Sequence, residues 1–194
     1  MSVSFVTLFL ALLALVAQAG VLAALVLWLG RRSPALARLG TSLRDSAGPQ
    51  AVTMAFAVAL TSTLGSLYLS EIAHYVPCKL CWYQRIAMYP LVPILLVAMF
   101  RKDNRVVSYV LPLTIIGGSI STYHLLLERF PQLEGAASCD ADNPCSAILL
   151  VRFGYLTIPI MALSGFALIT VLVLVARSWE SDSRRLGSSD SGQI

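Results

Sequence analysis

Two cysteines with C-x-x-C spacing and a nearby arginine are the residues of this chain best suited to chemistry. The run reads Pro77-Cys78-Lys79-Leu80-Cys81, and Arg85 follows four residues later. A C-x-x-C pair can cycle between a dithiol and a disulfide. Its closed ring is so small that it constrains the unfolded chain little. The pattern therefore favours redox chemistry over a purely structural disulfide.

The spacing predicts that these residues share one face at the start of a helix. Pro77 has the fixed φ angle that suits a first helical position, and residues three or four apart lie on the same side of a helix. The positive end of the helix dipole and the Arg85 guanidinium would both favour a thiolate. Arg85 could alternatively be an interfacial arginine whose head group reaches water. Its position beside the thiols favours the functional role.

A second pair, Cys139 and Cys145, completes the four cysteines of the chain, and all four lie in loops between apolar segments. Three interpretations are open: two structural loop disulfides, a zinc site with four thiolate ligands, or two communicating redox pairs. The C-x5-C spacing is wider than zinc sites usually have, so we expect no metal. An even number of cysteines in two pairs favours two redox disulfides.

Five apolar stretches must position these loops. The 194 residues are 57% hydrophobic and 12% charged, whereas soluble domains carry about 25% charged residues. The stretches are long enough to span a bilayer, and they cover about 3–29, 51–69, 82–100, 106–127 and 156–176. The sequence therefore predicts an all-α, multi-pass membrane protein. Ala17-Gln18-Ala19 resembles a signal-peptide cleavage site, but the apolar run continues well past it, so we expect an uncleaved span.

The positive charges predict the orientation in the membrane, because cytoplasmic loops are enriched in Lys and Arg. Such residues follow the first, third and fifth stretches: Arg31, Arg32, Arg38, Arg44, Arg101, Lys102, Arg105, Arg177, Arg184 and Arg185. The N-terminus and both cysteine loops are then expected outside, and the C-terminus in the cytoplasm. This distribution explains the net charge of +4 without a nucleic-acid partner.

The chain from about Ser66 to Leu168 resembles the disulfide bond formation protein B (DsbB) family, in its BdbC-like branch. The resemblance rests on the run from Pro77 to Pro90 with its C-x-x-C-W-Y-Q-R block, and on Ser70-Glu71-Ile72, Tyr123-His124, the second cysteine pair and Ile158-Pro159. It implies a four-helix bundle in the bacterial cytoplasmic (inner) membrane. It also implies a partner, an extracytoplasmic thioredoxin-fold thiol oxidase (DsbA-like), and a quinone, ubiquinone or menaquinone, as electron acceptor.

The resemblance also implies roles for individual residues. Cys78–Cys81 and Cys139–Cys145 would be redox disulfides, with Cys81 nearest the quinone and Arg85 supporting a quinone oxygen. Cys139 would be the target of the partner's thiolate, and Cys145 would resolve that mixed disulfide or exchange with Cys78. His124 could donate a proton to the quinone or be a hydrogen-bonded interfacial histidine, and the sequence leaves both open.

The predicted organisation has four parts. Residues 1–30 form an extra N-terminal transmembrane helix, 31–50 a cytoplasmic linker, 51–177 the DsbB-like four-helix membrane domain, and 178–194 a disordered cytoplasmic tail. Two alternatives remain for the function. One is a vitamin K epoxide reductase-like quinone reductase, although that family carries its quinone-facing C-x-x-C on a late span. The other is a non-catalytic membrane scaffold with structural loop disulfides.

Overall fold

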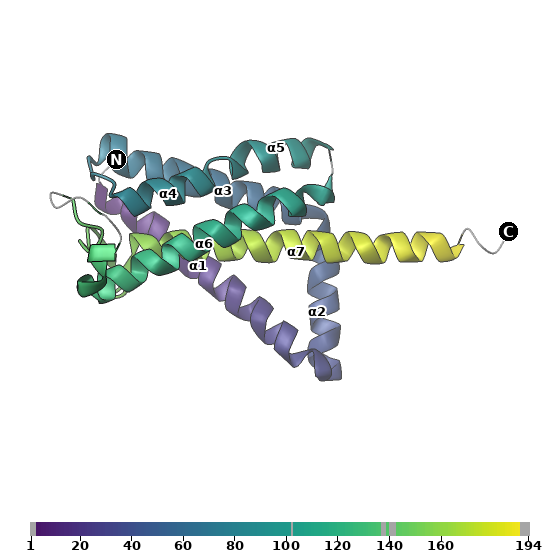
Figure 1. Ribbon diagram of the computed structural model, residues 1–194. Coiled ribbons are helices and arrows are strands. Elements are labelled where there is room, and N and C mark those ends of the chain that lie inside the picture. The colour runs from purple at the N-terminus through teal and green to yellow at the C-terminus, as the bar shows by residue number, and fades with distance from the viewer. Residues whose placement is uncertain (1–2, 102, 137–138, 140–142, 191–194) are drawn as a thin grey trace.

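The protein is almost entirely helical in a computed structural model that describes residues 3–101, 103–136, 139 and 143–190 (Figure 1). The α-helices are α1 (Val3–Leu29), α2 (Pro34–Ala47), α3 (Ala51–Leu67), α4 (Lys79–Met88), α5 (Leu91–Arg101), α6 (Val107–Arg129) and α7 (Ile158–Asp190). Short helical turns are η1 (Gly30–Arg32), η2 (Gly48–Gln50), η3 (Tyr68–Ile72), η4 (Asn104–Val106) and η5 (Pro131–Ala136). Strands β1 (Val151–Arg152) and β2 (Leu156–Thr157) form a small antiparallel hairpin.

The predicted membrane architecture is confirmed. Five helical segments of the described chain are long and apolar enough to cross a bilayer: Val3–Arg32, Pro34–Ile72, Lys79–Arg101, Val107–Arg129 and Ile158–Ser183. In Figure 1, α3, the α4–α5 pair, α6 and α7 run alongside one another as a four-helix bundle, and α1 crosses them obliquely. Helix α7 packs against α1, α3 and α6 and so forms the centre of the assembly.

The third predicted span is divided into two helices. Helix α4 begins at Lys79 with Cys78 as its N-cap, close to the helix start predicted near Pro77, whereas the apolar stretch itself begins near residue 82. It ends at Met88, and α5 begins at Leu91. Pro90 accounts for the break, because proline has no N–H to donate and its ring clashes with the carbonyl one turn earlier. The break leaves α4 as a short helix that carries the C-x-x-C motif.

Small residues allow the bundle helices to approach closely. Ala51, Ala55 and Ala59 of α3 are fully buried in the same cluster as Ile169 and Val173 of α7. Between α6 and α7, the ring of Phe166 packs directly onto the backbone of Gly117. Tight packing through small residues is typical of membrane helix interfaces. These contacts hold α3, α6 and α7 together in the middle of the bundle.

Residues 178–190 differ from the sequence prediction, which assigned a disordered tail to 178–194. Helix α7 continues to Asp190, and 191–194 lie outside the described residues. Two contacts with the segment between α1 and α3 hold the extension. The Trp179 ring packs against Gly48, and Arg44 Nη2 lies 2.7 Å from Asp182 Oδ2. The polar composition of the tail suggested disorder, but a tertiary partner for Trp179 is invisible in the sequence.

Helix α1 presents a narrow face of small residues to the bundle. Thr7, Ala11, Ala14 and Ala17 are its buried residues, while large side chains such as Phe5 and Leu22 are exposed.

Helix α2 lies roughly crosswise to the bundle, at the end opposite the cysteine loops (Figure 1). Together with η1 and η2, this helix makes up most of residues 31–50, so the predicted linker is mostly helical.

The contact between Gly117 and Phe166 yields a prediction for stability. A Cβ atom at Gly117 would overlap the fully buried Phe166 ring, so Gly117→Ala should destabilise the protein by about 1–3 kcal/mol. Gly118→Ala is the matched control, because its Cβ would meet Leu163 Cδ1 at an ordinary 3.8 Å. Thermal unfolding in detergent measures both variants. Equal unfolding midpoints would show that this contact does not limit the packing of α6 on α7.

Candidate active site

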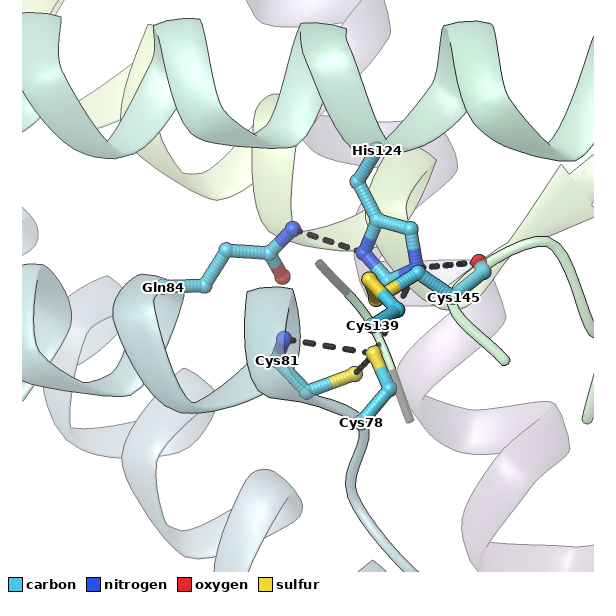
Figure 2. Close-up of a disulfide and its surroundings, with 6 residues drawn as sticks. All are labelled: Cys78, Cys81, Gln84, His124, Cys139 and Cys145. Carbon is cyan, nitrogen blue, oxygen red and sulfur yellow. Dashed lines mark hydrogen bonds between the residues drawn. A yellow bond between two sulfur atoms is a disulfide. The ribbon is translucent and has the colours of Figure 1, made fainter. Parts of the chain in front are cut away.

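The start of α4 holds Cys78 and Cys81 side by side. Cys78 is the N-cap, and its Sγ accepts a hydrogen bond from the Cys81 backbone N–H at 3.4 Å. The two Sγ atoms lie 3.0 Å apart, and both residues are thiols (Figure 2). Cys78 is buried and Cys81 is half-buried. The sulfurs therefore lie together at the helix N-terminus, as the spacing predicted, and the pair is in its dithiol form.

His124 of α6 connects the first cysteine pair to the second. Its Nε2 atom lies 3.1 Å from the backbone carbonyl oxygen of Cys145 and 3.7 Å from Cys78 Sγ (Figure 2). Its Nδ1 atom lies 3.2 Å from Gln84 Nε2. A carbonyl oxygen can only accept, so His124 Nε2 carries a proton, and the Gln84 amide donates to Nδ1. Through these contacts the imidazole links α4, α6 and the second cysteine loop.

The second pair is a disulfide between Cys139 and Cys145. Cys145 is fully buried in one cluster with Cys78, Leu80 and Leu127, and Cys81 and Cys139 pack against that cluster. The structure thus brings all four cysteines together, with one pair oxidised and the other reduced. This proximity is what direct exchange between the pairs requires.

The environment of Cys78 favours its thiolate. The hydrogen bond from the Cys81 thiol lowers the pKa of Cys78 well below the usual thiol value, and contacts with His124 and the Cys81 backbone N–H add to this effect. Burial acts in the opposite direction and is outweighed. A thiolate is the reactive form of cysteine. The surroundings of Cys78 therefore favour the reactive form of its thiol.

Arg85 lies one turn after Cys81 and is held by α3. Its Nε donates to Ser66 Oγ at 2.9 Å and its Nη2 donates to the Ser66 carbonyl at 3.0 Å. The guanidinium carbon lies 5.2 Å from the centre of the Trp82 ring. Arg85 is only 9% exposed, and the salt bridges found among the described residues do not include it. Its positive charge is therefore buried and held in place, with no carboxylate partner in the part of the chain that the structure describes.

A cavity of about 350 Å³ lies beside these groups. Cys81, Gln84, Arg85 and Ser66 supply polar lining, and most other lining residues are apolar side chains of α1, α3, α4 and α7. Pockets that are mainly apolar with a few convergent polar groups typically bind small molecules. This cavity suits an apolar ligand whose polar group points toward Cys81 and Arg85.

The sulfur atoms of Cys78 and Cys81 and a ring nitrogen of His124 all lie within 4.8 Å of one another. Such a set of soft ligands could hold a metal ion. The proton on His124 Nε2, however, is donated to the Cys145 carbonyl, and a metal would have to replace it. Cys139 and Cys145 are joined to each other and offer no thiolate. The arrangement favours thiol chemistry over the four-cysteine zinc site.

Two site residues, Gln84 and Ser66, were not singled out from the sequence. Gln84 lies three residues after Cys81, so the helical spacing that placed Arg85 on this face could also have identified it. Ser66 is 19 residues from Arg85, and no local pattern connects them. The π-helical turn η3 follows Ser66 closely, and such turns frequently occur at functional sites.

Comparison with known proteins assigns the family. The model of the family "Disulfide bond formation protein DsbB" matches residues 49–176. The chain belongs to the DsbB family. DsbB-family membership, the paired cysteines and the five membrane-length helices make it a membrane thiol–disulfide oxidoreductase. Helices α1 and α2 precede the matched region.

Relatives place the chain in the BdbC-like branch of the DsbB family, as predicted. Disulfide bond formation protein C of Bacillus subtilis (strain 168) is 48% identical over 125 residues, which cover 64% of this chain and 91% of the relative. Probable disulfide formation protein C 1 of Bacillus anthracis is 42% identical over 128 residues, covering 66% and 92%. No solved structure is significantly similar to the chain.

The contacts of Cys78 predict how its reactivity depends on pH. His124→Leu removes one interaction that lowers the pKa of Cys78, so this pKa should rise, and alkylation of Cys78 should require a higher pH. Alkylation of the reduced protein, followed by mass spectrometry at the Cys78 peptide, measures the midpoint. Tyr123→Leu, one residue away on α6, should leave it unchanged. Identical midpoints in both variants would show that His124 does not influence this thiol.

Proposed function

We propose that this protein reoxidises an extracytoplasmic thioredoxin-fold dithiol protein and passes the electrons to a membrane quinone. The observation that carries the proposal is the arrangement of Cys81 and Arg85. Both line an apolar cavity, while Cys78 on the same motif packs against the buried Cys145. One side of the C-x-x-C motif thus faces a cavity suited to an apolar molecule, and the other faces the second disulfide.

Electrons would enter at the second pair. Cys139 is partly exposed, whereas Cys145 is fully buried, so a thiolate of the partner would attack Cys139 Sγ. The Cys139–Cys145 bond breaks, a mixed disulfide forms, and Cys145 leaves as a thiolate. The partner's second thiol then attacks its own mixed disulfide and releases Cys139. The partner leaves with a new disulfide, and two electrons remain on Cys139 and Cys145.

Exchange between the pairs would follow, with Cys145 attacking an oxidised Cys78–Cys81 bond at Cys78. Cys139 then displaces Cys78, which restores the Cys139–Cys145 disulfide and leaves Cys78 and Cys81 reduced. The structure has this distribution, with the second pair oxidised and the first reduced. Because the reduced Cys78 is stabilised as a thiolate, it is a good leaving group in this step.

The mainly apolar lining of the cavity, with Cys81 and Arg85 among its polar groups, supports a quinone as the ligand. A quinone bound there would accept two electrons and two protons, and ubiquinone and menaquinone types share this chemistry. Arg85 is positioned to donate a hydrogen bond to an oxygen in the cavity, and its fixed positive charge would stabilise negative charge on that oxygen. Cys78 and Cys81 Sγ, 3.0 Å apart, would rejoin as the electrons leave. Overall, the partner loses two electrons and two thiol protons.

The proposed orientation places the cysteine loops outside the cytoplasm of a bacterium, in its cytoplasmic membrane. The cysteine loops and the N-terminus lie at one end of the bundle (Figure 1). The charged residues Arg31, Arg44 and Arg101 lie in η1, α2 and at the end of α5. These segments belong to the other end, which the positive-inside rule assigns to the cytoplasm.

Replacing Cys81 tests the proposal. Cys81→Ala should abolish reduction of a short-chain ubiquinone by a reduced thioredoxin-fold thiol oxidase, because the quinone-coupled pair can no longer form a disulfide. Absorbance of the quinone in detergent measures the rate. Wild-type turnover in this variant would contradict the proposal.

A second variant separates the two half-reactions. Cys139→Ser combined with Cys145→Ser should block electron entry from the protein partner. It should still reduce the quinone when dithiothreitol reaches Cys78 and Cys81 directly. A scaffold with structural disulfides would show no quinone reduction with either reductant, even in the wild-type protein.

A further inference from the structure

Helix α1 forms one wall of the cavity beside Cys81 and Arg85. Its lining residues are Leu10, Leu13, Ala14, Val16 and Ala17. The other walls come mostly from the family-matched region, 49–176. Helix α1 lies outside that region, so the sequence prediction treated it only as an extra span. The structure assigns it to the border of the site.

Polar contacts hold α1 in one rotational position. Gln18 Nε2 donates to Ser164 Oγ of α7 at 3.0 Å, and Tyr155 Oη donates to Gln18 Oε1 at 2.8 Å. Near the other end of this face, Arg152 Nη2 donates to Thr7 Oγ1 at 2.7 Å. Thr7 and Gln18 are eleven residues apart, three helical turns. The two anchors therefore flank the lining residues and orient them.

Close packing on α3 fixes the distance of α1 from the bundle. A Cβ atom at Gly65 would lie 2.7 Å from Leu10 Cδ2, so the absence of a side chain at Gly65 makes room for Leu10. Ala14 and Ala17 are 7% and 5% exposed, and each presents only a methyl group to the cavity. The width of the cavity on this side therefore depends on two small residues of α1.

We propose that α1 closes the quinone cavity on one side and that Ala14 and Ala17 set the size of the ligand it accepts. This inference rests on the proposed quinone-dependent function. On the α1 side, the bound molecule contacts protein side chains in place of lipid. A larger side chain at position 17 occupies space that the ligand needs. A smaller side chain at position 10 removes apolar contacts between α1 and the ligand.

Binding of a short-chain ubiquinone to the purified, oxidised protein tests the inference without requiring turnover. Saturable quenching of tryptophan fluorescence gives the affinity, and Trp82 beside Arg85 is a reporter near the cavity. Ala17→Leu should weaken binding about tenfold or more. The matched control is Ala19→Leu, the same change at an exposed position of α1 outside the cavity lining.

Leu10→Ala is a second variant that cannot overfill the cavity, and it should weaken binding several-fold through lost apolar contact. Thermal unfolding of each variant, measured alongside, checks that it is folded at the temperature of the binding assay. If the wild type shows no saturable binding, the quinone proposal itself fails. If the wild type binds but Ala17→Leu and Leu10→Ala bind as tightly as Ala19→Leu, then α1 does not border the ligand and this inference is overturned.

Discussion

The hydrogen bond from His124 to the Cys145 carbonyl is the constraint on which the rest of the site depends. It fixes a loop that has little regular structure against α6, at a buried position where an unpaired carbonyl would cost about 1–3 kcal/mol. The same ring accepts a hydrogen bond from Gln84 on α4 and contacts Cys78. One side chain thus sets the spacing between the two cysteine pairs and lowers the pKa of Cys78.

The bundle separates two chemical environments around the C-x-x-C motif. Cys78 faces a small buried cluster of sulfur and leucine side chains, whereas Cys81 and Arg85 line the cavity. The guanidinium is held by Ser66 from α3, so it needs little reorganisation to meet a ligand oxygen, and such preorganised charge is most effective where water is excluded. The break between α4 and α5 permits this arrangement by making α4 a short unit at one end of the bundle.

Local spacing and apolar length were sufficient to predict much of this protein. The five spans, the helix start at the C-x-x-C motif and the shared face of Cys78, Cys81 and Arg85 follow from short-range rules. The His124–Cys145 contact joins residues 21 apart, and the Arg85–Ser66 contact depends on how α3 packs against α4; neither leaves a local pattern. The helical extension of α7 and the place of α1 likewise depend on tertiary contacts with Trp179 and Gly65.

The central claim is that the two cysteine pairs form one redox unit through Cys78 and Cys145. A variant with Cys81→Ser and Cys139→Ser leaves only these two thiols, and mass spectrometry of non-reduced peptides measures the bond between them. The account predicts that a Cys78–Cys145 disulfide forms in most molecules on mild oxidation of the purified protein. Two free thiols under the same conditions, in a variant that is folded, would contradict direct exchange between the pairs.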